Sequence, residues 1–295
     1  MAIPYRKFRL FNGVGNYFTL TEPSYKVFAD DPSGLGYSKT MSTLRLGDDY
    51  AIPYQIFNLD QMSFTIRFYD DKLSDKYQKY VDFINFLSHK PLYLQYQRPN
   101  SFTWYRRRIE TLSLGKTQVD YQNRMLSCPF VIQPLTFWED DKSNVIETDN
   151  QFESGKVYPI TYPIVYGNTS INNIDMTAIG LLDAPIQLTI DGTVVNPQYI
   201  LYDEKGNVYG RGKFNGTFDR VYVNSDEAEE YVELQRGGLI LDNPLSYQDL
   251  TIGSPNEVYV TFLKLKTGNS KIRFIVDSGF TGSVKLEWRN RYVTV

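Results

Sequence analysis

The sequence is poor in the residues from which most catalytic and metal sites are built. Its 295 residues include one histidine, His89, and one cysteine, Cys128. A single cysteine excludes a disulfide within the chain and is typical of proteins that fold in a reducing cytoplasm. One chain also cannot supply the roughly four Cys and His ligands of a structural zinc site. We therefore expect neither a metal ion nor a cofactor.

The sequence also lacks a large positive charge and a long apolar run. Its formal net charge is −3, whereas nucleic-acid-binding proteins carry a strongly basic face and lipid-binding segments carry clusters of Lys and Arg. No segment approaches the roughly 20 apolar residues of a membrane-spanning helix. The opening MAIPYRKFRLFNG has no apolar region of the kind found in secretory signal peptides. We expect no membrane partner and folding in the cytoplasm of the producing cell.

Aromatic residues, by contrast, are abundant, with 24 Tyr and 18 Phe. Such residues favour β-sheets and are also enriched at protein–protein interfaces. Residues 62–68 and 92–97 alternate between apolar and polar side chains, which is typical of half-buried strands. The length exceeds the roughly 100–200 residues of a common single domain. The sequence therefore predicts a mainly β protein with two domains.

One segment in the first half has helical periodicity. After the expected N-cap Ser74, apolar residues recur at helical spacing, and Pro91 ends the pattern. These residues are Tyr77, Tyr80, Val81, Ile84 and Leu87. His89 falls in the last turn, where a cation suits the helix dipole. We interpret His89 as the end of a packing helix and not as a catalytic base.

The second half consists of short strand patterns separated by turns, as in a sandwich or jelly roll. Before it, the polar and acidic stretch 139–155 has no sustained period, so it is predicted to join the two domains. We expect an N-terminal domain over 1–140, a linker over 141–155 and a second domain over 156–295. The last strand, 284–295, is expected either to complete the second domain or to return to the first.

Three short patterns suggest chemistry, and each has a simpler explanation. Asp277 lies in FIVDSGFTGS, which resembles the loop of aspartic proteases, but those enzymes need a second such aspartate. Arg106, Arg107 and Arg108 alternate on a strand, so they divide between its two faces. Cys128 shares an apolar strand face and is expected to lie in the core. We assign no catalytic, cofactor or metal residue and expect no enzyme.

The order of elements in the first half resembles that of the distal tail proteins, which form the baseplate hub of long, non-contractile-tailed phages of Gram-positive bacteria. The resemblance covers about residues 1–140, and the length is similar to that of lactococcal members. It rests on an ordered series of segments: LFNGVGNYFTL, PSGLGYSKT, MSFTIRFYD, KYQKYVDFINFL, PLYLQYQRP, YRRRIETLSLGKT and LSCPFVIQPLTFW.

The resemblance implies a structural virion protein at the tail tip. Distal tail proteins form a ring of six copies that continues the tail tube, and DNA passes through its lumen without specific binding. Their partners are the tail tube protein, the tail-associated hub or fibre protein and, in some members, receptor-binding proteins. The resemblance also implies an N-terminal β-sandwich with one helix and a second, galectin-like sandwich.

Two other functions remain open from the sequence. The second domain could bind host cell-wall glycans through aromatic side chains such as Trp288 or Tyr259, although alternation favours Trp288 as a core residue. The chain could also be an enzyme that degrades cell-wall glycans through a carboxylate pair, since Asp and Glu number 34. The oligomeric state separates both from a ring-forming hub.

Overall fold

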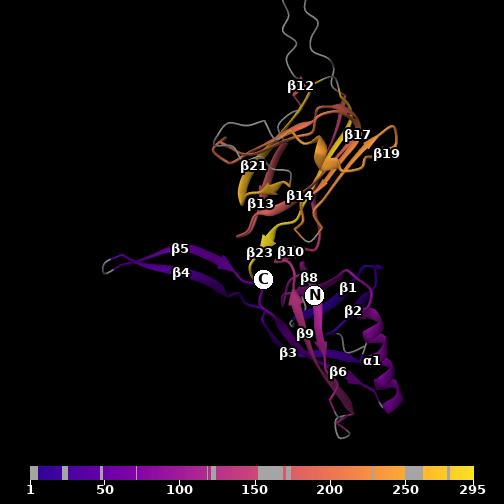
Figure 1. The fold of residues 1–295 in the computed structure, drawn as a ribbon. Coiled ribbons are helices and arrows are strands. Elements are labelled where there is room, and N and C mark those ends of the chain that lie inside the picture. The colour runs from indigo at the N-terminus through magenta and orange to yellow at the C-terminus, as the bar shows by residue number, and fades with distance from the viewer. Residues whose placement is uncertain are drawn as a thin grey trace, which may run out of the picture. The chain divides into compact units, whose positions relative to one another are not determined.

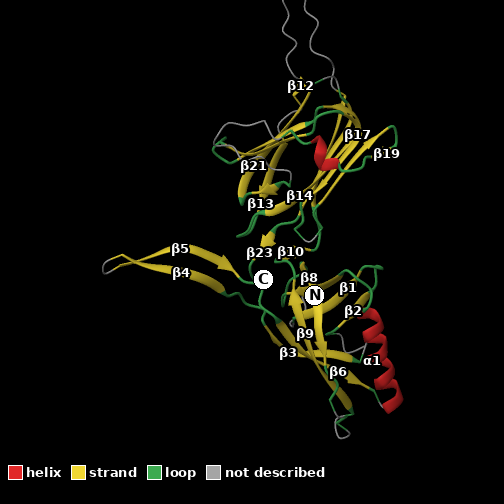
Figure 2. Cartoon of the chain, in the orientation of Figure 1, coloured by secondary structure: helices red, strands yellow, loops and turns green. Residues whose placement is uncertain are grey.

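The structure, a computed structural model, describes residues 6–21, 26–46, 49–70, 72–117, 119–120, 124–151, 169–170, 174–227, 229–249, 262–277 and 280–295. It divides into two compact units. The first consists of Met1–Asp141 and Tyr292–Val295, and the second of Lys142–Arg291. Antiparallel strands form most of both units, and the described residues contain one α-helix, α1 (Leu73–Leu87) (Figures 1 and 2). The predicted mainly β fold with one helix is confirmed.

An antiparallel sheet wraps around the core of the first unit. Its strands lie in the order β2 (Tyr17–Thr19), β1 (Lys7–Asn12), β7 (Leu92–Gln97), β8 (Trp104–Leu114), β9 (Met125–Pro134), β6 (Met62–Tyr69) and β3 (Val27–Ser33). The two edges approach each other, because the Ala29 N–H on β3 donates to the Leu20 carbonyl just after β2, at 2.7 Å. The sheet is therefore curled, and its inner face is the core.

The alternation predicted for residues 62–68 is confirmed in β6. Its residues alternate between buried and half-buried positions, and Phe64 and Ile66 contribute to the core. Cys128 on β9 pairs in register with Ile66 and is fully buried. Period-two alternation therefore identified both the strand and its inward face.

Helix α1 covers this core with part of the predicted stripe, since Tyr77, Tyr80 and Leu87 pack against the core. Phe83 is fully buried and contacts the rings of Phe18, Phe68 and Phe130, whereas Val81 and Ile84 are 45% and 43% exposed. The buried face is therefore shifted from the predicted stripe toward Phe83, whose large ring gains more from burial than Val81 or Ile84 would. The helix begins with Lys72 at the N-cap, and Ser74 makes no capping bond.

Two sheets pack face to face in the second unit. The β14 sheet has the order β11 (Asn144–Gln151), β22 (Thr281–Trp288), β14 (Ala184–Val195), β17 (Thr217–Asn224), β18 (Tyr231–Arg236) and β19 (Leu239–Ile240), with β20 (Lys264–Leu265) beside β14. The β21 sheet has the order β12 (Thr169–Ser170), β21 (Gly268–Val276), β15 (Gln198–Tyr202) and β16 (Val208–Lys213), with β13 (Ile174–Ala178) beside β21. A short 3-10 helix, η2 (Pro244–Tyr247), follows β19. One core contains residues of both sheets, so the unit is a two-layer sandwich.

The stretch expected to join the domains is largely strand in its described part. β10 (Trp138–Asp140) pairs with β8 of the first unit, and β11 pairs along its whole length with β22 of the second. Within the expected linker 141–155, residues 144–151 thus belong to the β14 sheet. β11 is an edge strand with few inward apolar residues, which explains why its alternation is weak in the sequence. Residues 152–155 lie outside the described residues.

The C-terminal residues are divided between the two units. β22 completes the β14 sheet, so residues 281–288 stay in the second unit. The last four residues, Tyr292–Val295, belong to the first unit. β23 (Arg291–Tyr292) lies at this division and pairs with β10. The return to the first unit is therefore shorter than the predicted strand 284–295.

Candidate functional site

The clearest candidate for an interaction surface is a hairpin in the first unit. It consists of β4 (Lys39–Leu46) and β5 (Asp49–Phe57), which among the described strands pair only with each other and extend away from the rest of the unit (Figure 1). Its base is held by the contact between Tyr37 and Phe57, whose ring centroids are 5.7 Å apart, and by the Asn58 side chain, which donates to the Ser38 hydroxyl at 2.9 Å. The hairpin is thus firmly attached at one end.

One face of this hairpin carries exposed apolar side chains. The register places Leu44, Tyr54 and Ile56 on the same face, and their exposed fractions are 55%, 55% and 45%. An isolated two-stranded hairpin is only marginally stable in water. Contiguous exposed apolar side chains also usually mark a protein contact. The hairpin is therefore suited to binding another chain.

The sequence itself contains an indication of this hairpin. Strand-prone residues at 40–46 and 49–57 flank Gly47 and Asp48, a pair typical of turns. Pro53 and the bulge between Ser42 and Leu44 interrupt the alternation, which weakens the periodicity that would otherwise identify two strands.

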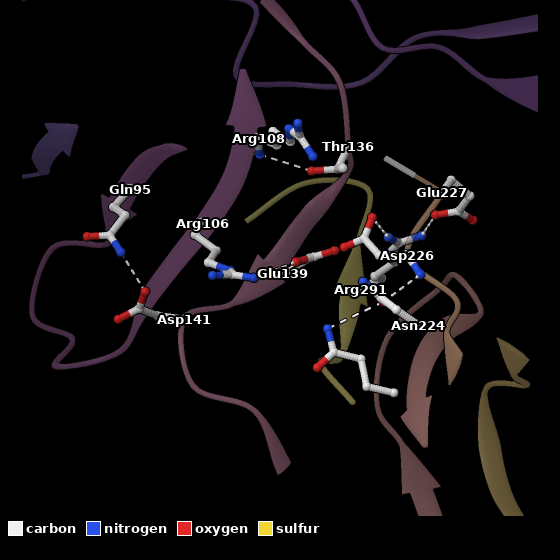
Figure 3. Close-up of polar contacts among 11 residues, drawn as sticks. Gln95, Arg106, Arg108, Thr136, Glu139, Asp141, Asn224, Asp226, Glu227 and Arg291 are labelled. Carbon is white, nitrogen blue, oxygen red and sulfur yellow. Dashed lines mark hydrogen bonds and ion pairs between the residues drawn. The ribbon is translucent and has the colours of Figure 1, made fainter. Parts of the chain in front are cut away.

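In the first unit, polar contacts hold the chain near Asp141, where the N-terminal part of this unit ends. Asp141 accepts a hydrogen bond from the Gln95 amide at 2.5 Å, and Glu139 is 3.6 Å from the Arg106 guanidinium (Figure 3). Arg9 adds a third link, because its guanidinium is 3.9 Å from Asp141 and stacks 4.0 Å from the Trp104 ring. These side chains lie on the outer face of β1, β7 and β8.

In the second unit, ion pairs hold Arg291, which is the last residue of this unit. This guanidinium is almost fully buried and pairs with Glu227 at 2.6 Å and Asp226 at 3.8 Å (Figure 3). Burial opposes the charged form of Glu227, but the hydrogen bond from Lys264 and the charge of Arg291 hold its pKa below the usual value. The cluster is a structural ion-pair network whose charges compensate one another.

Two of the residues with possible chemistry lie in different units. His89 follows α1, and its Nδ1 donates to the Asn85 carbonyl at 2.8 Å. This nitrogen therefore provides a hydrogen bond to a carbonyl in the last turn of the helix. Asp277 follows β21 in the second unit and accepts a hydrogen bond from the Asn196 amide at 2.6 Å. Each of these two side chains therefore has a structural contact within its own unit.

The buried residues Cys128 and Arg107 have structural roles. Burial raises the pKa of the Cys128 thiol to about 11, which keeps it protonated. Arg107 points into the core while Arg106 faces outward, as the alternation predicts. The Arg107 guanidinium donates twice to the Thr136 carbonyl and lies over the Trp138 ring. Among the described residues, no group of three His, Cys, Asp or Glu side chains is placed to hold a metal ion.

The aromatic residues of the glycan hypothesis do not form a surface platform in the described structure. Trp288 is 7% exposed and belongs to the core of the second unit. Tyr259 lies outside the described residues. In the described part of the chain, no helix has the length and apolar character needed to cross a membrane.

Comparison with known families and structures agrees with the resemblance noted from the sequence. Residues 7–135 match the family described as distal tail protein, N-terminal domain. No curated protein sequence matches the chain.

Two solved structures share the fold over nearly their whole length. A chain of the phage P2 baseplate in its activated conformation with Ca superimposes with a TM-score of 0.64 at 16% identity, covering 98% of this chain and 99% of that one. The Dit protein of phage SPP1 superimposes with a TM-score of 0.55 at 11% identity, covering 96% and 98%. Both units of the fold therefore have counterparts in these chains.

Proposed function

Because residues 7–135 match the N-terminal domain of the distal tail protein family, we propose that the chain is a structural hub at the tip of a long, non-contractile phage tail, where six copies form a ring. The ring-forming part is the first unit. The second unit is the galectin-like sandwich that the resemblance implies. The protein is not an enzyme, and it is folded in the cytoplasm of the bacterial host before tails assemble.

The observation that carries this proposal is the exposed apolar face of the β4–β5 hairpin. A ring of identical subunits needs a heterologous contact, in which one surface of each copy meets a different surface of the next. Leu44, Tyr54 and Ile56 provide such a surface on an element that extends away from the rest of its unit. Its burial against a neighbour would stabilise both the hairpin and the ring.

The same assignment defines the partners. The ring joins the tail tube protein on one side to the tail-associated hub or fibre protein on the other, and its periphery carries receptor-binding proteins. DNA passes through the lumen without specific binding, for which a chain with a net charge of −3 is suited. The SPP1 protein that shares the fold is described as a paradigm of the hub adsorption apparatus in phages of Gram-positive bacteria, which supports this placement.

Immunogold labelling of purified phage tests the proposal. Antibodies against the chain should bind at the distal end of the tail, in particles from cells that produce the encoding phage. Labelling along the tail shaft, or purified infectious particles that lack the chain, would contradict a hub at the tip. A host-derived glycan-binding protein or a wall-degrading enzyme need not be a stoichiometric part of the particle.

A further inference from the structure

The two outer faces of the second unit carry opposite charge. In a strand, alternate side chains point to opposite faces of the sheet, so the residues between the core positions of each sheet form its outer face. The two sheets share one core, and their outer faces are therefore on opposite sides of the sandwich. Each face is identified by the register of its strands.

The outer face of the β14 sheet is acidic. A row across the sheet follows the register Glu147, Lys285, Thr189, Tyr222 and Glu233, with a carboxylate at each end. Among the residues whose side chains are described, this face has four carboxylates and two cations, a net charge of −2: Glu147, Asp191, Glu233, Glu287, Lys285 and Arg220.

Both cations of this acidic face are neutralised within it. Lys285 pairs with Glu287 at 3.2 Å, and Arg220 pairs with Asp191 at 3.3 Å. Glu147 and Glu233 stand at the two ends of the row. Burial, followed by the charge of Glu287, raises the pKa of the Tyr222 phenol between them, as expected near surplus negative charge.

The outer face of the β21 sheet is basic. Ile200 lies between Arg211 on β16 and Arg273 on β21 in the strand register. Lys213 and Lys271 extend this face, and pair with Asp249 and Asp175 at 3.4 Å each. Four cations against two carboxylates give the face a net charge of +2. The chain as a whole is acidic, so this basic face is not a consequence of composition.

We propose that the basic face of one copy binds the acidic face of the next copy around the ring. The inference rests on the proposed ring and adds a second contact between neighbours, made by the second unit. Two different, complementary surfaces on opposite sides of a subunit are what a heterologous, ring-closing contact requires. Opposite charges there favour the correct register and disfavour contact between like faces.

Intermolecular cross-linking of the full chain tests which faces meet. A carbodiimide joins lysine amines directly to carboxylates, and mixing isotope-labelled with unlabelled protein distinguishes links between copies from links within one. We expect mixed-label links from Lys271 or Lys213 to Glu147 or Glu233, which disappear at high salt as the charges are screened. Six-copy rings without these links would overturn the inference while leaving the hub proposal intact. Linked copies that never close into a ring would support the face contact and contradict the ring.

Charge reversal provides a second, independent test. Arg273→Glu makes the basic face more acidic, and Glu233→Lys makes the acidic face more basic. Each variant alone places less complementary faces in contact, so we expect half-assembly to need at least about tenfold more protein. In an equal mixture the two variants can alternate around an even-numbered ring, with every altered face opposite an altered partner, and assembly should recover.

The matched control is Lys205→Glu, which reverses a charge in the β15–β16 turn. This control should assemble like the unaltered chain. The thermal unfolding temperatures of all three variants should equal that of the unaltered chain. If Arg273→Glu and Glu233→Lys assemble as well as this control, or if mixing them restores nothing, the two faces do not meet.

Discussion

Tyr105 and Tyr292 meet edge to face, with ring centroids 5.5 Å apart and 85° between the ring planes. Tyr292 also donates to the Asp140 carboxylate at 3.5 Å, and Asp140 is the register partner of Tyr105. The next residue, Val293, is buried. The last residues of the chain are therefore part of the packing of the first unit, whose other residues end at Asp141.

Replacing Tyr292 with alanine should destabilise the first unit by about 1–3 kcal/mol, because the ring contact and part of the buried apolar area are lost. Urea unfolding of the full chain, followed by alkylation of Cys128, measures this unit specifically. Tyr231→Ala, which removes a half-exposed ring in the second unit, should leave the Cys128 transition unchanged. Equal midpoints for the Tyr292 variant and the unaltered chain would contradict the packing role.

The same tyrosine should make stability depend on alkaline pH. Burial, and then the charge of Asp140, raises the pKa of Tyr292 to about 12. A raised pKa favours the protonated phenol in the folded state, so its contribution is fully present below the usual value near 10 and is lost as pH rises through about 12. The difference in unfolding free energy between the chain and Tyr292→Phe should change across that window. A difference that stays constant from pH 8 to 12 would count against it.

Replacing Arg107 should reduce the unfolding free energy more than replacing most other charged residues of the first unit. Removing its buried guanidinium leaves the Thr136 carbonyl without its two donors, and we expect Arg107→Ala to cost about 2–4 kcal/mol of unfolding free energy. Arg6→Ala, at an exposed position, should cost less than about 0.5 kcal/mol. Chemical denaturation of both variants provides the comparison, and similar losses would contradict the buried role of Arg107.

Cys128 should be unreactive until the first unit unfolds. With its pKa raised to about 11 from 9.0, its thiolate population near pH 8 falls roughly 100-fold, and burial slows access further. Alkylation in buffer should therefore be slow, and in strong denaturant it should be fast. Rapid labelling of the folded chain would show that Cys128 lies outside the core.

The sequence alone was sufficient to predict those elements whose apolar residues follow a single clear period. The alternation of Met62–Phe68 identified β6 and its buried face, and the same reasoning placed Cys128 in the core. The helix was predicted, and Tyr77, Tyr80 and Leu87 of its predicted stripe pack on the core. Phe83 was missed, because Phe83 and Ile84 are neighbours in sequence and either fits a helical stripe. Spacing alone cannot determine which one meets Phe68 and Phe130, since those rings come from other strands.

The missed elements lie where tertiary contacts compensate for weak patterns. In β11 the alternation of apolar and polar residues is too weak to predict a strand. Its backbone is a strand because it pairs with β22. The β4–β5 hairpin contains a proline and a bulge, and its apolar residues are uncovered in the single chain. Such residues resemble surface positions to a sequence analysis that assumes burial within one copy.

The mass of the assembled protein in solution, with the tail tube protein present, tests the central claim most directly. The account predicts particles containing six copies of the 34.2 kDa chain, and single copies for the variant Leu44→Ser, Tyr54→Ser, Ile56→Ser with unchanged thermal unfolding. The matched control changes Ile179, Leu181 and Leu245 to serine, which are 63%, 73% and 49% exposed in the second unit, and it should still form six-copy particles. Single copies of the unaltered chain at every concentration, or six-copy particles from the hairpin variant, would contradict the account.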